Sequence, residues 1–115
     1  MSKEFDSVDE WLSVPEVAER LNIPLGKVRR YIEEHMLFSV RFDGVQKIPA
    51  HLIASGEPLP SLRGTILVLI DAGFDVDSAA AWLYRVEESI GRAPIELLLE
   101  GRKSEVRRVA QSLAY

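Results

Sequence analysis

A three-residue interruption between two short helical segments is the feature that most constrains the fold of this chain. Ser13 is suited to cap the first segment, and Glu16 follows three residues later, as in a capping box. Pro24 disfavours helical backbone geometry at the residue before it, so the first helix ends by that point. A second helix is expected over residues 25–35. Two helices joined by so tight a turn form a helix-turn-helix.

The second of these helices carries an apolar face and a basic face. At about 100° per residue, one side collects three apolar side chains, namely Leu25, Val28 and Ile32. The opposite arc holds three basic side chains, namely Lys27, Arg29 and Arg30. Such a helix can enter the major groove of DNA, because lysine and arginine pair with phosphates and arginine also hydrogen-bonds the guanine edge. A solvated basic face, common on surface helices, fits this helix equally well.

A predicted β-hairpin follows the basic helix. Residues 38–42 alternate in the manner of a strand, Asp43-Gly44 is typical of a tight hairpin turn, and residues 45–48 return. Pro49 is expected to end the pairing. An ordinary surface hairpin would have the same residues, but a hairpin directly after a basic helix-turn-helix predicts a wing. Two basic side chains are expected on the polar face of this wing, near the sugar–phosphate backbone, namely Arg41 and Lys47.

The distribution of charge supports this interpretation better than the total charge does. The whole chain has 115 residues and a net charge of −4, which argues mildly against a nucleic-acid partner. Residues 1–19, however, hold six acidic side chains and one basic one. Residues 20–48 hold six basic and three acidic side chains. The sign of the charge therefore reverses where the helix-turn-helix begins, and Arg20, at the end of the first helix, is a weaker additional candidate for DNA contact.

The second half of the chain is expected to be a set of short helices. Their starts and ends are marked by capping residues, glycines and prolines, namely Ser61, Gly73, Asp75 or Asp77, Pro94, Gly101, and Lys103 or Ser104. The apolar residues between these signals, from Leu62 to Val86 and beyond, are expected to form a core. Four basic residues gather near the C-terminus, either as a solvated face or as a supplementary phosphate contact, namely Arg102, Lys103, Arg107 and Arg108.

Several function classes lack their characteristic residues. The chain has no cysteine, which removes disulfides, thiolate metal sites and thiol nucleophiles. His35 and His51 are the only histidines and do not form a zinc-hydrolase pattern; His35 is expected to favour the C-terminal end of its helix electrostatically. No enzyme activity, cofactor or metal is therefore predicted. The acidic N-terminus and the short apolar runs predict a cytoplasmic protein without a membrane span.

Two resemblances follow from these residues. Residues 12–24, 27–32 and 43–49 resemble the first helix, recognition helix and wing of the excisionase and MerR type. The whole chain resembles an actinobacterial family of winged-helix DNA-binding proteins with a helical C-terminal domain of unassigned role. The stretches that carry this second likeness are 17–24, 27–28, 61–67, 71–74, 82–83 and 105–111. It implies that the first half binds duplex DNA, and it does not imply an enzyme.

The sequence thus predicts a mainly α fold, a winged helix-turn-helix with a small β-hairpin wing followed by a C-terminal helical bundle. An N-terminal tail is expected over 1–11, a DNA-binding domain over 12–56, and a helical domain packed on it over 57–115. The six predicted DNA contacts are Lys27, Arg29, Arg30, Arg41, Lys47 and Arg20.

The predicted function is duplex DNA binding through residues 25–35 and 38–48, as a transcriptional regulator or a nucleoid-associated factor. The C-terminal helices are candidates for a homodimer contact or for binding a protein partner. The alternative is a protein-interaction module or antitoxin-like adaptor, in which the helix-turn-helix is a scaffold and the basic helix meets an acidic protein. Glu33, Glu34 and Asp43 would favour this alternative if they interrupted the positive surface.

Overall fold

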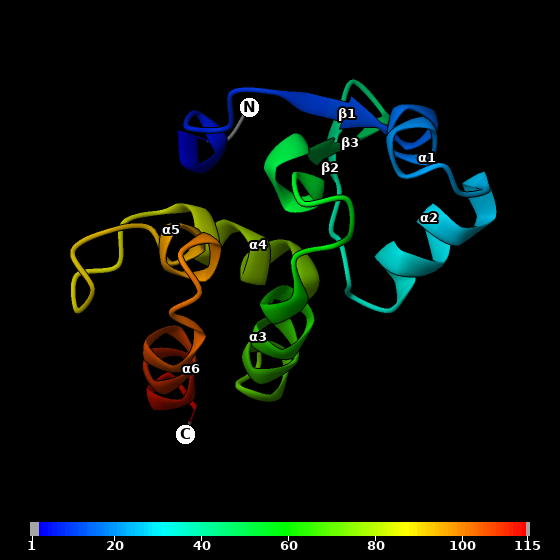
Figure 1. Cartoon of the computed structure of the whole chain (residues 1–115). Helices are drawn as coiled ribbons and strands as arrows, with labels where there is room; N and C mark the ends of the chain where they lie inside the picture. Colours follow the sequence, from blue (N-terminus) through cyan, green and yellow to red (C-terminus); the bar gives the residue numbers. More distant parts are fainter. Residues whose placement is uncertain (1–2, 115) are drawn as a thin grey trace. The chain divides into compact units, whose positions relative to one another are not determined.

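The computed structural model describes residues 3–114 (Figure 1), and these residues form two compact units. The first unit comprises residues 8–60. The second comprises residues 3–7 and 61–114. The N-terminal segment, expected to be a tail over 1–11, is thus divided between the two units. Its 3-10 helix η1 (Lys3–Phe5) belongs to the second unit, where the Phe5 ring lies 5.2 Å from the Tyr84 ring between centroids.

The first unit is a helix-turn-helix followed by a hairpin and a short 3-10 helix. Its elements are β1 (Trp11–Ser13), α1 (Val14–Leu21), α2 (Leu25–Glu33), β2 (Val40–Phe42), β3 (Val45–Pro49) and η2 (Ala50–Ile53). The strands form one antiparallel sheet in the order β1-β3-β2. The winged helix-turn-helix predicted from the sequence is therefore confirmed, with β1 as an additional strand.

Helix α1 begins and ends as its sequence predicts. The Ser13 hydroxyl accepts a hydrogen bond from the Glu16 amide at 3.2 Å, and the Ser13 amide donates to the Glu16 carboxylate at 2.8 Å, which completes the capping box. Asn22 ends the helix in the left-handed conformation, at φ 55°. The buried face of α1 includes Val17, and Val28 of α2 is also fully buried. Because both side chains are buried and α1 contacts α2, this apolar packing holds the two helices together at the turn.

Helix α2 is shorter than predicted. It ends at Glu33 rather than at residue 35, and His35 lies beyond the helix end with a left-handed φ of 64°. The amides of Met36 and Leu37 both donate to the carbonyl of Tyr31, so the chain turns sharply away from the helix here. His35 is therefore a residue of this turn.

The hairpin turn has the predicted geometry, and strand β3 ends at Pro49, as the sequence predicts. Asp43 and Gly44 both have positive φ, 52° and 80°, as a two-residue turn of type I′ requires. Strand β3 continues to Pro49, which is opposite Trp11. The next residue, Ala50, donates its amide to the Glu10 carbonyl at 2.9 Å. In an antiparallel pair only alternate residues donate across the ladder, so the missing N–H of Pro49 removes no bond.

The second unit is a bundle of short helices, as predicted. Besides η1 it contains α3 (Pro60–Asp71), α4 (Val76–Tyr84), α5 (Pro94–Leu99) and α6 (Lys103–Ser112). The Asp75 carboxylate caps α4 by accepting from the Ser78 amide at 2.8 Å. The core of the second unit is built from large apolar side chains that are almost fully buried, namely Leu62, Ile66, Leu69, Trp82, Leu83, Leu97 and Leu98. Val86, expected in this core, lies outside α4 and is 69% exposed.

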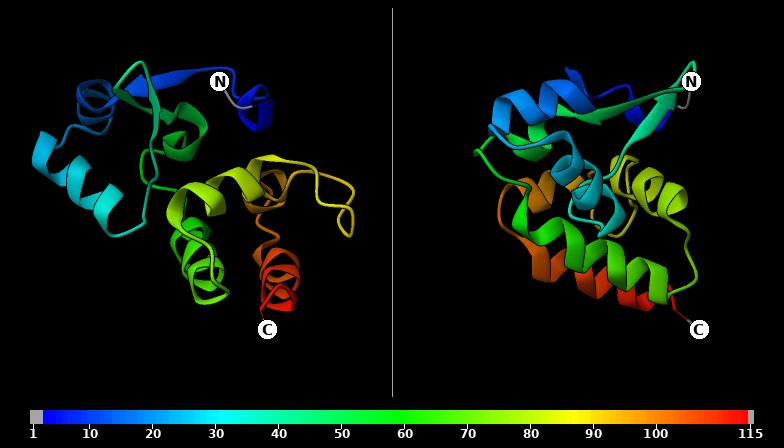
Figure 2. Two further views of the ribbon diagram at one scale, coloured as in Figure 1. Left: turned by 180° about the vertical axis from the view of Figure 1, so that it is seen from behind. Right: turned by 90° about the vertical axis from the view of Figure 1, so that its right-hand side faces the viewer.

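Helices α3 and α6 run side by side in this unit (Figure 2), and the Arg107 side chain of α6 reaches Gly64 of α3. The Arg107 guanidinium of α6 lies over the backbone of Gly64, where a Cβ atom would overlap it. It also donates to the Ser61 carbonyl at 3.3 Å, which accepts a second bond from the Thr65 hydroxyl at 2.9 Å. The absence of a side chain at Gly64 thus leaves room for the Arg107 guanidinium in this position.

Candidate nucleic-acid interface

The basic face of α2 is exposed and free of acidic partners. The helix buries Val28 completely, and the burial of this apolar side fixes which side faces outward. Lys27, Arg29 and Arg30 are all exposed, and within residues 3–114 none of the three forms an ion pair. The Lys27 ammonium lies 5.8 Å from the centre of the Tyr31 ring, close enough for a cation–π contact. Three positive charges are thus available on one helix surface.

The two basic residues of the wing point to opposite faces of the sheet, which corrects the prediction that they share one polar face. Arg41 pairs with Gln46, whereas Lys47 pairs with Val40 on one side and Ser13 on the other. Directly paired residues share a face and neighbours along a strand alternate, so Arg41 and Lys47 are separated by the sheet. The cause is the two-residue turn, which sets a register with Phe42 opposite Val45.

Each wing cation has a different local environment. The exposed Arg41 guanidinium donates to the Gly44 carbonyl at 2.9 Å and so braces the turn. Lys47 is half-buried on the face where Trp11 and Phe42 meet edge to face, with ring centroids 4.8 Å apart. The aromatic pair joins β1 to β2 across β3 and was not foreseen from the sequence, because β1 is too short to show an alternating pattern.

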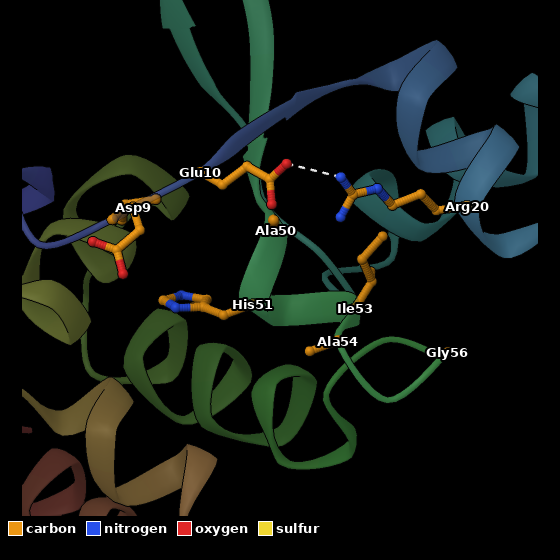
Figure 3. Close-up of a pocket in the computed structure, with 9 residues that line it drawn as sticks. Asp9, Glu10, Arg20, Ala50, His51, Ile53, Ala54 and Gly56 are labelled. Carbon is orange, nitrogen blue, oxygen red and sulfur yellow. Dashed lines mark hydrogen bonds and ion pairs between the residues drawn. The ribbon is translucent and has the colours of Figure 1, made fainter.

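Arg20, the weakest of the six candidates, is part of a separate pocket (Figure 3). Its guanidinium forms an ion pair with Glu10 at 2.8 Å, and both side chains are about half exposed. The pocket has a volume of about 580 Å³ and is also lined by Asp9 and His51. Burial lowers the pKa of His51, and the Asp9 carboxylate partly opposes this shift. The carboxylates therefore offset the positive charge of Arg20.

Three acidic side chains border the basic surface. Glu33 is exposed on α2, four residues after Arg29 and three after Arg30, which places it beside them on the helix surface. Glu34 is exposed immediately after α2, four residues after Arg30. Asp43 is exposed at the tip of the wing. The first two turns of α2 therefore carry exposed basic side chains and no acidic one, whereas acidic side chains lie at the end of the helix and at the wing tip.

The C-terminal basic residues do not form a comparable surface. Arg102 pairs with Glu105 at 2.9 Å and with Glu100 at 3.4 Å, and Arg107 is occupied by the packing against α3. This leaves Lys103 and Arg108 as the exposed cations of α6 that have no ion pair within the described part of the chain.

Residues 3–114 contain no group of three histidine, aspartate or glutamate side chains placed to hold a metal ion. None of their helices has the length and apolar character needed to cross a lipid bilayer.

A helix-turn-helix followed by a hairpin that pairs with a preceding strand defines a winged helix-turn-helix protein. A family model described as the DNA-binding protein Rv2175c wHTH domain matches residues 4–53, and one described as the Rv2175c C-terminal domain of unknown function matches residues 59–114. The chain is 30% identical to DNA-binding protein Rv2175c of Mycobacterium tuberculosis, over 89% of this chain and 79% of the relative. This chain therefore belongs to the Rv2175c family, and the resemblance to an actinobacterial winged-helix family is confirmed.

A solved structure supports the same conclusion for the fold. The NMR structure of Rv2175c matches this structure with a TM-score of 0.83 at 29% sequence identity. The match covers 96% of this chain and 84% of the other. Both units therefore have counterparts in the relative.

Proposed function

We propose that this protein binds duplex DNA, with α2 in the major groove and the wing against the sugar–phosphate backbone. The observation that carries the proposal is the exposed, unpaired basic face of α2, mounted on a helix-turn-helix. The name of the relative, a DNA-binding protein, agrees with it. Lys27, Arg29 and Arg30 would contact phosphates and base edges. Arg41 and Lys47 would contact the backbone from the two faces of the wing, and Arg20 would contribute least because Glu10 already pairs with it.

The proposed mechanism is binding without a chemical step or a cofactor. Each phosphate that a lysine or arginine neutralises releases counterions, so affinity falls as salt rises, by a slope of about 0.9 per contact in logarithmic units. With about five contacts, a single copy would bind at roughly 10⁻⁴ to 10⁻⁶ M, the non-specific range. Tighter binding would need a second copy or a partner held by the C-terminal helices. We propose that such binding serves a transcriptional regulator or a nucleoid-associated factor in the cytoplasm.

A second candidate function is favoured by Glu33, Glu34 and Asp43, which border the basic surface. In that case the chain is a protein-interaction module or an antitoxin-like adaptor, its helix-turn-helix is a scaffold, and α2 binds an acidic protein. Both candidates use the same basic residues, so only the choice of ligand separates them.

The test is an anisotropy titration of a labelled duplex at two salt concentrations. The native chain is compared with Lys27→Ala/Arg30→Ala and with Lys103→Ala/Arg108→Ala, which removes two exposed charges from α6 instead. We expect native binding that weakens with salt, at least a tenfold loss for the α2 variant and little change for the α6 variant. Absence of native binding even at low salt would reject the DNA proposal and leave the protein partner. Equal losses in both variants would show that only total charge matters.

A further inference from the structure

Gly26, in the first turn of α2, is a glycine that the fold does not explain. Glycine is among the least favourable residues in a helix, so it needs a local reason. Gly64 has one in the Arg107 guanidinium, and five others adopt positive φ, namely Gly44, Gly56, Gly73, Gly91 and Gly101. Gly26 has neither reason. Its φ is not in the left-handed region, and a Cβ atom added there would meet no atom of the described chain within 4 Å.

The position of Gly26 places it within the basic face. Residues three and four apart on a helix are neighbours on its surface, so Gly26 lies directly beside Arg29 and Arg30. All three are exposed, and neither arginine is held by an ion pair within residues 3–114. The basic face of α2 therefore has no side chain at the position that neighbours both arginines.

We propose that Gly26 is the point of closest approach between α2 and the DNA. Without a side chain, the helix backbone can come against the wall of the groove, and the long side chains of Arg29 and Arg30 extend past it to the phosphates and base edges. Glycine serves this purpose wherever a backbone must approach a ligand closely. The inference rests on the proposed function, since it assumes that the ligand of this face is duplex DNA.

The proposal is testable because Gly26→Ala is expected to raise stability and to lower DNA affinity. Because the site is open and helical, Gly26→Ala raises the stability of α2, and we expect the midpoint of thermal unfolding to rise by about 3 °C. The same methyl group would hold the helix away from the groove. We therefore expect about tenfold weaker binding of a labelled duplex by Gly26→Ala, and a larger loss for Gly26→Leu.

The control is Ser104→Ala, a helix-favouring change at an exposed position of α6, which leaves DNA affinity unchanged under the same salt conditions. A variant that is more stable and yet binds less tightly cannot owe its loss to misfolding. If the native chain binds DNA and Gly26→Ala and Gly26→Leu bind equally well, the inference about Gly26 is wrong and the proposed function stands. If the native chain does not bind DNA, both are wrong.

Discussion

Two groups of basic residues, one on α2 and one at the start of α6, are alike in sequence and different in structure. On α2, Lys27, Arg29 and Arg30 are exposed and have no acidic partner within residues 3–114. Near α6, Arg102 is paired with two glutamates and Arg107 is packed over Gly64. The first group can attract a ligand, and half of the second already serves the fold. A cluster of positive charge therefore indicates a binding surface only when nearby acids and packing leave it unoccupied.

The largest difference between α2 and α6 is expected when one charge is reversed on each helix. Arg30→Glu places a carboxylate in the proposed groove-facing surface, and we expect about hundredfold weaker DNA binding from lost attraction and added repulsion. Arg108→Glu makes the same change on an exposed position of α6, and we expect less than a threefold effect. The measurement is duplex affinity at one low salt concentration. Equal losses would show that the α6 surface contributes as much as α2.

Truncating one arginine in each group separates stability from binding. Arg107→Ala loses the hydrogen bond to the Ser61 carbonyl and the packing of the guanidinium over Gly64 of α3. We expect it to lower the free energy of unfolding by about 1–2 kcal/mol, with little effect on DNA affinity. Arg29→Ala should do the reverse, with a change within about 0.5 kcal/mol in stability and a clear loss of affinity. Urea denaturation gives the free energy of unfolding of each variant, and duplex titration gives its DNA affinity. A stability loss in Arg29→Ala would mean that this arginine is also structural.

Removing an acidic residue from the wing tests whether its negative charge weakens DNA binding by the basic surface. Asp43→Asn keeps a residue suited to the type I′ turn, since Asn-Gly is favoured there as Asp-Gly is. It deletes a negative charge from the wing tip. We expect about threefold tighter DNA binding, with unchanged stability, in the same titration. Weaker binding would indicate that the Asp43 side chain contacts the DNA directly.

The smallest expected effect concerns acid stability. Hydrogen bonds from the Ser13 backbone and side chain hold the pKa of Glu16 below its ordinary value. A depressed folded-state pKa contributes stability above the unfolded-state pKa, and this contribution is lost as pH falls through the folded-state value. We therefore expect the free energy of unfolding to fall less between about pH 5 and pH 3 in Glu16→Gln than in the native chain. An identical pH dependence would show that the capping box has no electrostatic part.

The features predicted correctly from the sequence are mainly those that neighbouring residues determine. The Ser13–Glu16 box, the turn before Pro24, the Asp43-Gly44 hairpin and the Asp75 cap each depend on residues within four positions. Their geometry is therefore encoded where it occurs.

Three of the errors and omissions come from contacts between distant segments or from register. Strand β1 exists because it pairs with β3, more than thirty residues later, and three residues carry no periodic pattern of their own. The role of Arg107 depends on Gly64 of another helix. The opposite faces of Arg41 and Lys47 follow from the hairpin register, which the two-residue turn already implied.

The most direct test of the central claim is to locate the bound DNA by following backbone amide chemical shifts of the native chain during titration with a short duplex. The proposed function predicts that the largest shifts occur over residues 25–33 of α2 and 40–47 of the wing, with little change in α6. Shifts concentrated over residues 103–112 of α6, or no shifts at a saturating amount of duplex, would contradict it.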